Sequence, residues 1–124
     1  MEIAFTDREL DVMGVLWERG PSTVAEVRET LSDELAYTTV LTVLRVLEGK
    51  GHLTHREEGR AHRYEARVPR EQAGRSALRK VVRKIFQGSP EQLLTQLVSD
   101  RNLTDAEIRR MRELLDRHID TEDG

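Results

Sequence analysis

The chain has 124 residues, a formal net charge of −3 and no cysteine. This length is enough for one domain, or for a small head with an appended helical element. Without cysteine the protein can form neither a disulfide framework nor a thiolate metal site. No apolar run approaches the roughly 18–20 residues of a membrane span, and the N-terminus lacks the basic and apolar regions of a signal peptide. We therefore expect a cytoplasmic protein that does not insert into membranes.

Charge is distributed unevenly along the chain. Residues 1–35 carry three arginines against nine acidic residues, whereas residues 36–70 carry seven basic against four acidic residues and three of the four histidines. Binding to a polyanion follows the local electrostatic field rather than the total charge. The basic middle segment is therefore a candidate nucleic-acid footprint within an acidic protein.

Two helices are predicted in the first 35 residues. Residues 6–9 (Thr-Asp-Arg-Glu) form a capping box, in which the threonine and glutamate side chains satisfy backbone N–H groups at a helix start. Apolar residues then recur at three- and four-residue spacing up to about Arg19, and Gly20-Pro21 ends this helix. A second capping box at residues 23–26 (Thr-Val-Ala-Glu) opens a short helix that ends near Ser32.

A third helix is predicted from about Tyr37 to Lys50, with Gly51 as its C-cap. At about 100° per residue, its side chains separate into two faces. The outer face carries threonines, branched aliphatic residues and one arginine, where a solvated helix normally carries glutamate and lysine. The inner face, expected in the core, consists of Val40, Val43, Leu44 and Leu47, and the outer face is centred on Thr38, Thr42 and Arg45.

Two strand-like runs follow, Leu53–Arg56 and His62–Ala66, joined by a loop that contains Gly59. Three helices followed by a hairpin are the arrangement of a winged helix. Pro69 then marks a boundary, because the residue before a proline disfavours helical geometry. We expect residues 1–69 to form a mainly α winged helix-turn-helix head with a small β-hairpin wing.

Residues 70–124 are predicted to form a helical dimerisation domain. Apolar residues recur there at helical spacing in three segments, with Ser89-Pro90 as one helix start and a capping box at residues 104–107 as another. Three helices in about 50 residues bury too little apolar surface alone, so such a layer usually completes its core against a second copy of itself. The candidate dimer contacts are Leu78, Val81, Val82, Ile85, Phe86, Leu94, Leu97, Ile108, Met111 and Leu115.

The outer face of the third helix and the hairpin together predict contact with double-stranded DNA. Threonine hydroxyls and aliphatic side chains suit base edges and thymine methyl groups in the major groove, and an arginine can reach a guanine or a phosphate. Arginines on a wing can follow the DNA backbone or enter the minor groove. The candidate DNA contacts are Thr38, Thr39, Thr42, Arg45 and Lys50 on the helix and Arg60, His62 and Arg63 on the wing.

Little in the sequence supports a metal site or a catalytic site. His52, His55 and His62 suggest a metal site, but strand side chains three residues apart point to opposite faces, so no metal is expected. The sequence has no cysteine nucleophile, glycine-rich phosphate loop or nucleophile elbow, and its carboxylates lie on predicted solvated helix faces. We expect neither enzyme activity nor a cofactor.

The sequence resembles the penicillinase-repressor family of the BlaI/MecI type over nearly its whole length. The resemblance depends on residues 6–13 with Leu16-Trp17, on residues 36–44 (AYTTVLTVL), on residues 60–64 (RAHRY) and on residues 85–89 (IFQGS). It implies a homodimer with winged-helix heads and a helical C-terminal domain. It also implies binding to inverted-repeat operators, with short TACA/TGTA-type half-sites, in front of resistance or stress genes.

The resemblance also bears on how repression ends. Several family members leave DNA when a membrane metalloprotease sensor, or an enzyme that it activates, cuts the C-terminal domain. The corresponding stretch here lies near Gln96-Leu97 and lacks the Asn-Phe pair of the staphylococcal members. Copper-responsive relatives sense through C-terminal cysteines, which this chain does not have. A sensor-linked protease is therefore a candidate partner.

These observations predict a homodimeric, sequence-specific DNA-binding repressor. Two alternatives stay open at this point. One is a winged-helix interaction module that binds protein and never DNA, in which the face of Thr38 and Thr42 docks a partner. The other is a regulator that senses a small molecule in a pocket between head and tail.

Overall fold

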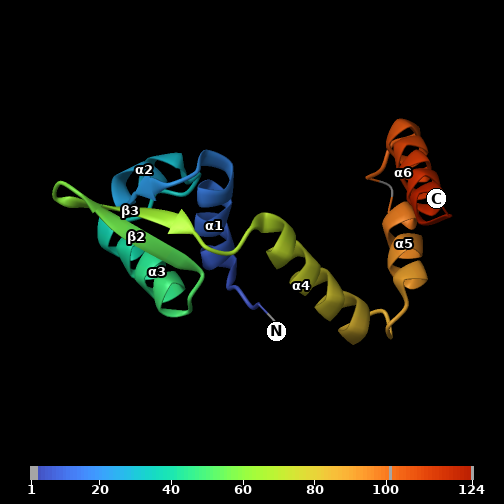
Figure 1. Cartoon of the computed structure of the whole chain (residues 1–124), viewed down its shortest axis with the longest axis horizontal. Helices are drawn as coiled ribbons and strands as arrows, with labels where there is room; N and C mark the ends of the chain where they lie inside the picture. The colour runs from blue at the N-terminus through green and yellow to red at the C-terminus, as the bar shows by residue number, and fades with distance from the viewer. Residues whose placement is uncertain (1–2, 101, 124) are drawn as a thin grey trace. The chain divides into compact units, whose positions relative to one another are not determined.

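A computed structural model of the chain describes residues 3–100 and 102–123. The chain divides into two compact units, Met1–Arg79 and Lys80–Gly124. The first unit contains α1, β1, α2, α3, β2 and β3, and α4 runs from the first unit into the second, which also contains α5 and α6 (Figure 1). The bounds are α1 Asp7–Arg19, β1 Ser22–Thr23, α2 Val24–Thr30, α3 Tyr37–Gly49, β2 Leu53–Glu58, β3 Ala61–Ala66, α4 Arg70–Lys84, α5 Pro90–Ser99 and α6 Asp105–Asp123.

Both predicted capping boxes at the start of the chain are formed. The Thr6 hydroxyl accepts the N–H of Glu9 at 3.1 Å, and the Glu9 carboxylate accepts the N–H of Thr6 at 2.8 Å. Thr23 and Glu26 make the same reciprocal pair, at 3.2 and 2.9 Å. Each box satisfies N–H groups that a helix start leaves without partners, which fixes where α1 and α2 begin. Gly20 adopts a φ of 90° after α1, a conformation that a side chain would disfavour.

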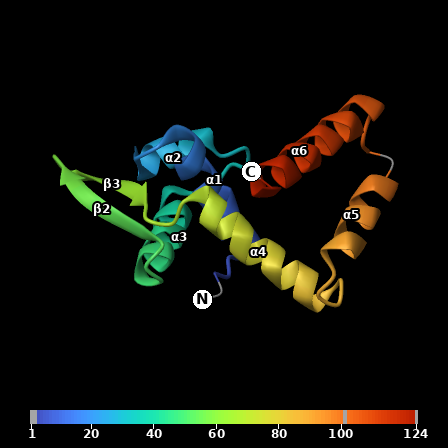
Figure 2. The ribbon, with the colours of Figure 1, turned by 45° about the vertical axis from the view of Figure 1, so that its right-hand side comes forward.

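The three strands form one antiparallel sheet in the order β1-β3-β2. β2 and β3 pair over their whole length, so the hairpin is longer than predicted and its turn is reduced to Gly59 and Arg60. Gly59 has a φ of 63°, as tight two-residue hairpin turns require. Figures 1 and 2 show the hairpin extending past the helices of its own unit. The sequence did not predict β1, whose two residues pair with β3 at Tyr64 and Arg63.

The core of the first unit lies between α1, α2, α3 and the sheet. The inner face of α3 is confirmed, since Val40, Leu44 and Leu47 are fully buried. Val43, which was also expected there, is half-buried and packs against the edge of the core. The remaining core is supplied by Val12, Met13, Val15, Leu16, Val24, Val27, Leu53, Tyr64, Val68 and Ala73.

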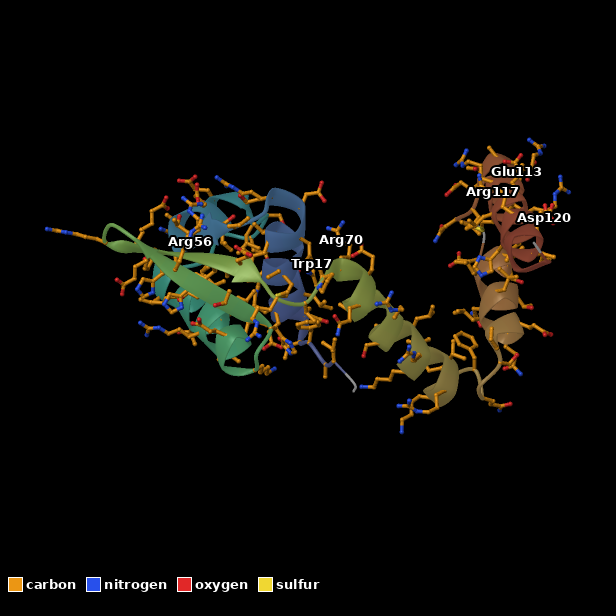
Figure 3. All side chains as sticks on the ribbon, in the orientation of Figure 1. Trp17, Arg56, Arg70, Glu113, Arg117 and Asp120 are labelled. Atoms are coloured by element: carbon orange, nitrogen blue, oxygen red, sulfur yellow. The ribbon has the colours of Figure 1, made fainter. Side chains whose placement is uncertain are left out.

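The first turns of α4 are attached to α1 through aromatic contacts. Trp17 donates its Nε1–H to the carbonyl of Val68 at 2.8 Å, and the guanidinium of Arg70 lies 5.8 Å from the centre of the Trp17 ring. Figure 3 shows these two labelled side chains beside each other. Phe5 meets Trp17 edge-on at 6.2 Å, and the N–H of Ile3 donates to the Ser76 hydroxyl at 2.8 Å. The start of α4 is therefore part of the first unit.

The second unit consists of helices with little interior of their own. Ser89 caps α5 by accepting the N–H of Gln92 at 3.2 Å, and Thr104 and Glu107 form the predicted capping box of α6 at 3.0 and 3.1 Å. None of its described side chains, at 80–100 and 102–120, is buried. Within residues 3–100 and 102–123, no helix has the length and apolar character needed to span a bilayer.

The mainly helical chain with its small antiparallel sheet confirms the predicted winged helix-turn-helix fold. The boundary between residues 69 and 70 stays a prediction. The two compact units meet inside α4, between Arg79 and Lys80.

Candidate nucleic-acid interface

The outer face of α3 is open to solvent, as the pattern of its side chains predicts. Thr38, Thr39, Thr42 and Arg45 are all exposed, while Val40 and Leu44 between them are buried in the core. The Thr42 hydroxyl donates to the carbonyl of Thr38 at 2.9 Å, and its oxygen can still accept a hydrogen bond. The face therefore presents hydroxyl groups and methyl groups on a rigid helix whose opposite side is fixed in the core.

Arg45 is the arginine of this face, and its charge influences the buried Tyr64. Burial and the negative charge of Glu48 raise the pKa of the Tyr64 hydroxyl, whereas the positive charge of Arg45 lowers it, with burial prevailing. Tyr64 belongs to β3 and is only 1% exposed.

The wing tip carries the most accessible of the predicted wing contacts. Arg60 occupies the two-residue turn and is exposed. Arg63, further along β3, is 21% exposed and already bonded: its Nε donates to Glu58 at 2.7 Å, and its Nη1 donates to Glu26 at 2.9 Å and to the Pro21 carbonyl at 3.1 Å. These bonds connect β3 to the turn before α2. They leave Arg63 less free than Arg60 to approach a phosphate.

Lys50, the last of the predicted helix contacts, is also engaged. Its ammonium group lies 2.8 and 3.0 Å from the two carboxylate oxygens of Glu9, a side chain that is only 6% exposed. Burial alone would raise the pKa of Glu9, but the hydrogen bond and charge of Lys50, with the hydrogen bonds from Thr6, hold it below its ordinary value. Lys50 therefore ties the end of α3 to the start of α1.

The contacts of His62 with other side chains were not predicted from the sequence. Its ring stacks on His55 with centroids 4.3 Å apart and planes at 14°, and His55 Nδ1 lies 2.6 Å from a carboxylate oxygen of Glu48. His55 and His62 stand on neighbouring strands on the same face of the sheet, whereas His52 lies against Phe5 at 4.9 Å. Two paired strands bring side chains on the same face together, so the stacking of His55 on His62 could be predicted once the strand register is known. That register follows from the full length of the hairpin, which is longer than the sequence predicts.

Metal binding is not suggested by the groups that the structure brings together. No set of three or more histidine, aspartate or glutamate side chains with the placement of a metal site occurs among residues 3–100 and 102–123. The site thus consists of an exposed hydroxyl-rich helix face that carries one arginine, and a hairpin tip that carries Arg60. Such a surface can form hydrogen bonds with base edges and phosphates.

The sequence profile of the penicillinase repressor family matches residues 5–117. The chain belongs to the penicillinase repressor family. This confirms the resemblance found in the sequence and shows that it covers both compact units.

Two relatives agree with this membership. The chain is 49% identical over 61 residues to the transcriptional regulator BlaI of Mycobacterium tuberculosis, a match that covers 47% of the chain and 44% of the relative. It is 25% identical over 115 residues to the penicillinase repressor of Bacillus licheniformis, covering 91% of the chain and 90% of that protein. The chain thus matches less than half of the length of this BlaI protein.

Two solved structures share the fold. A MarR family protein from Bacillus stearothermophilus aligns with a TM-score of 0.51 at 17% identity, over 98% of this chain and 78% of the other. The transcriptional regulator Tm0710 from Thermotoga maritima aligns with a TM-score of 0.50 at 21% identity, over 95% of this chain and 76% of the other. At these identities the likeness concerns the fold alone. Together with the family, it supports a winged-helix transcriptional regulator.

Proposed function

We propose that this member of the penicillinase repressor family is a homodimeric, sequence-specific DNA-binding repressor. It binds an inverted-repeat operator, with α3 in the major groove and the tip of the β2–β3 hairpin on the adjacent backbone or minor groove. Its target genes are those of antibiotic resistance or stress, in keeping with the relatives named penicillinase repressor and BlaI.

The observation that carries the proposal is the exposure of Thr38, Thr42 and Arg45 on a helix whose other side is fully buried. A recognition helix must be fixed from behind and free in front, because base contacts require side chains held in register with the groove. A surface that only needed to be soluble would not favour threonine and valine, which lower helix propensity. Arg60 at the hairpin tip adds a sequence-independent attraction to phosphates.

A homodimer is supported by the apolar side chains of the second unit. Ile85, Leu97 and Leu115 are 45–67% exposed, and no described side chain from 80 to 120 is buried. Exposing so many large aliphatic side chains in water is unfavourable, at about 25 cal/mol per Å² of apolar surface. Two heads on one dimer would also bind two half-sites together, which raises affinity for a palindromic operator.

Selection of bound sites from random duplex DNA, followed by sequencing, tests the proposal. We expect the wild-type protein to enrich a palindromic sequence whose half-sites are separated by about one helical turn. The Arg45→Ala variant should lose preference at one base pair of each half-site, a cost of about 1–3 kcal/mol. An exposed arginine of α6, Arg112→Ala, serves as the control. Absence of any enriched sequence and of any salt-dependent gel shift would favour the alternative, an interaction module for protein partners.

Release from DNA by proteolysis is a further part of the proposal. Gln96 and Leu97 are both exposed on α5, but the backbone carbonyl of Gln96 accepts the N–H of Asp100 at 3.1 Å, so the segment is helical and must unwind before a protease can cut it. Replacing 94–99 by the recognition sequence of a site-specific protease tests the consequence. Cutting there should separate the two heads and lower operator affinity at least about tenfold, because the second half-site no longer adds to the first. Unchanged affinity after complete cutting would refute release by this route.

A further inference from the structure

Arg63 belongs to a chain of alternating charges that joins the hairpin to the corner between α1 and α2. Its Nε donates to Glu58 of β2 at 2.7 Å, and its Nη1 donates to one carboxylate oxygen of Glu26 of α2 at 2.9 Å. The other carboxylate oxygen of Glu26 accepts from Nη2 of Arg19, the last residue of α1, at 3.0 Å. We call Arg19, Glu26, Glu58 and Arg63 the wing-base network.

Backbone groups fix the end of the network that lies at the helix corner. Glu26 accepts the N–H of Thr23 at 2.9 Å in the capping box of α2, and Thr23 in turn pairs with Arg63 between β1 and β3. The Nη1 of Arg63 also donates to the carbonyl of Pro21 at 3.1 Å. The hydrogen bond from Thr23 and the charges of the two arginines hold the pKa of Glu26 below its ordinary value, against the effect of burial. Glu26 is therefore an ionised acceptor in a fixed position at neutral pH.

The other end of the network lies beside the turn of the hairpin. Glu58 and Ala61 form the last pair of the β2–β3 ladder, and the turn between them consists of Gly59 and Arg60. Figures 1 and 2 show the hairpin extending past the helices of its own unit. A two-stranded hairpin alone is at most marginally stable in water. The direction of the tip therefore depends on what holds the strands behind it.

The network engages Arg63 within the protein. Its side chain is 21% exposed, and its three hydrogen bonds to Glu26, Glu58 and Pro21 would have to break before the guanidinium could reach a phosphate. The two carboxylates also offset the repulsion between Arg63 and Arg56, which stands directly opposite in the ladder. The guanidinium thus serves to join strands and helix.

We propose that Arg63 is a positioning residue for the wing and not itself a phosphate contact. Bonded to Glu26 and Glu58, it sets the direction of the hairpin, so that Arg60 in the turn meets the DNA backbone in a defined position. The inference deepens the proposed function and rests on it, because it assigns a role within the same DNA-binding site. It replaces the direct DNA contact that the sequence predicts for Arg63.

The decisive variant is Arg63→Lys, which keeps the positive charge and removes the guanidinium fork. Binding is measured with the full-length protein on random duplex DNA and on the palindromic site selected by the wild type. We expect the affinity for both to fall about three- to tenfold, because the hairpin must then be ordered at the moment of binding. A direct phosphate contact would survive this substitution, since lysine binds phosphate as a point charge. Unchanged affinity would overturn the proposal.

Glu26→Gln tests the network from its acidic side. A glutamine here still completes the capping box, so α2 keeps its start while the negative charge that holds Arg63 is lost. Loss of a negative charge near DNA would by itself raise affinity. We expect affinity to fall instead, about as far as in Arg63→Lys, whereas the control Glu29→Gln, at an exposed position of α2, should bind at least as tightly as the wild type. Wild-type or higher affinity in Glu26→Gln would also overturn the proposal.

A double-mutant cycle with Arg60→Ala separates positioning from a general loss of stability. If Arg63 acts by directing Arg60, Arg63→Lys should lower affinity little further in the Arg60→Ala background, so the two losses are not additive. A merely structural role would lower the melting temperature and reduce affinity by the same factor in both backgrounds. Additive losses would therefore remove the positioning role.

The wild type distinguishes the two possible failures. If it shows no salt-dependent binding to any duplex, the proposed function fails and the role of Arg63 fails with it. If it binds DNA, and Arg63→Lys and Glu26→Gln bind as tightly, only the present inference is overturned.

Discussion

Lys50 has two candidate roles, because the sequence predicts that it contacts DNA and the structure pairs it with Glu9. The change that separates the two roles is Lys50→Met, which keeps the aliphatic stem and removes the charge. It leaves a carboxylate that is 6% exposed with Thr6 as its remaining hydrogen-bond partner. We expect the free energy of unfolding to fall at neutral pH.

The size of that loss follows from the burial of the two partners. Removing one member of a fully buried ion pair typically costs about 3–5 kcal/mol. Here the lysine side chain is 42% exposed, so water reaches the ammonium side of the pair and screens it. A loss of about 1–3 kcal/mol is therefore expected, the cost of leaving a buried acceptor poorly satisfied. For a unit of this size that corresponds to a fall in Tm of roughly 4–8 °C per kcal/mol.

The pH dependence of this effect has a definite sign. The pKa of Glu9 in the folded protein lies below the ordinary value of 4.5, so the ionised form is favoured by folding. The stabilisation is fully present above pH 4.5 and is lost as the pH falls through the lower folded pKa. The difference in stability between wild type and Lys50→Met should therefore be largest near pH 7 and should shrink toward about pH 3.

Urea denaturation followed by the fluorescence of Trp17, the single tryptophan, measures this directly, because Trp17 lies in the same unit. Lys84→Met on the surface of α4 is the control. Equal stability of Lys50→Met and wild type at pH 7, or a loss that persists unchanged at about pH 3, would refute the reasoning. In DNA titrations, a flattening of the salt slope by about one in Lys50→Met, and not in Glu9→Gln, would show that Lys50 also contacts a phosphate.

Three further predictions concern the core, the wing and the second unit. Leu44→Ala should destabilise the first unit by about 2–5 kcal/mol in urea denaturation, because Leu44 is fully buried. The control Val46→Ala, at an exposed position, should change stability by less than about 0.5 kcal/mol. Equal effects would mean that the faces of α3 are misassigned. Arg60→Ala should weaken binding to all DNA sequences alike. It should also reduce by about one the slope of log affinity against log salt concentration, as measured by titration at several salt concentrations. A loss of affinity confined to the selected site would contradict a contact with the DNA backbone. Ile85→Glu should convert the dimer to a monomer in analytical ultracentrifugation, because Ile85 is an apolar side chain that is 67% exposed in the single chain. The fluorescence of Trp17 should not change. An unchanged sedimentation coefficient would exclude the surface around Ile85 as the dimer interface.

Much of the fold could be read from local sequence. The capping boxes at Thr6 and Thr23 determine where α1 and α2 begin, because the partners of each box lie within three residues of each other. The two faces of α3 also follow from the spacing of its residues alone, and the burial of Leu44 beside exposed Thr42 confirms them. Such features depend on interactions within one helical turn, which the order of residues specifies directly.

The pairing of distant residues was decided only by the tertiary structure. β1 has two residues and no alternating pattern, so nothing local marks it, and it exists because β3 offers Ser22 and Thr23 free backbone partners. The bond between Lys50 and Glu9, the three partners of Arg63, and the stacking of His55 on His62 likewise join residues that are far apart in the chain or on separate strands. The sequence shows which charged groups and aromatic rings are present. Their positions depend on how helices and strands pack, so the ion pairs of Lys50 and Arg63 could not be predicted from the sequence.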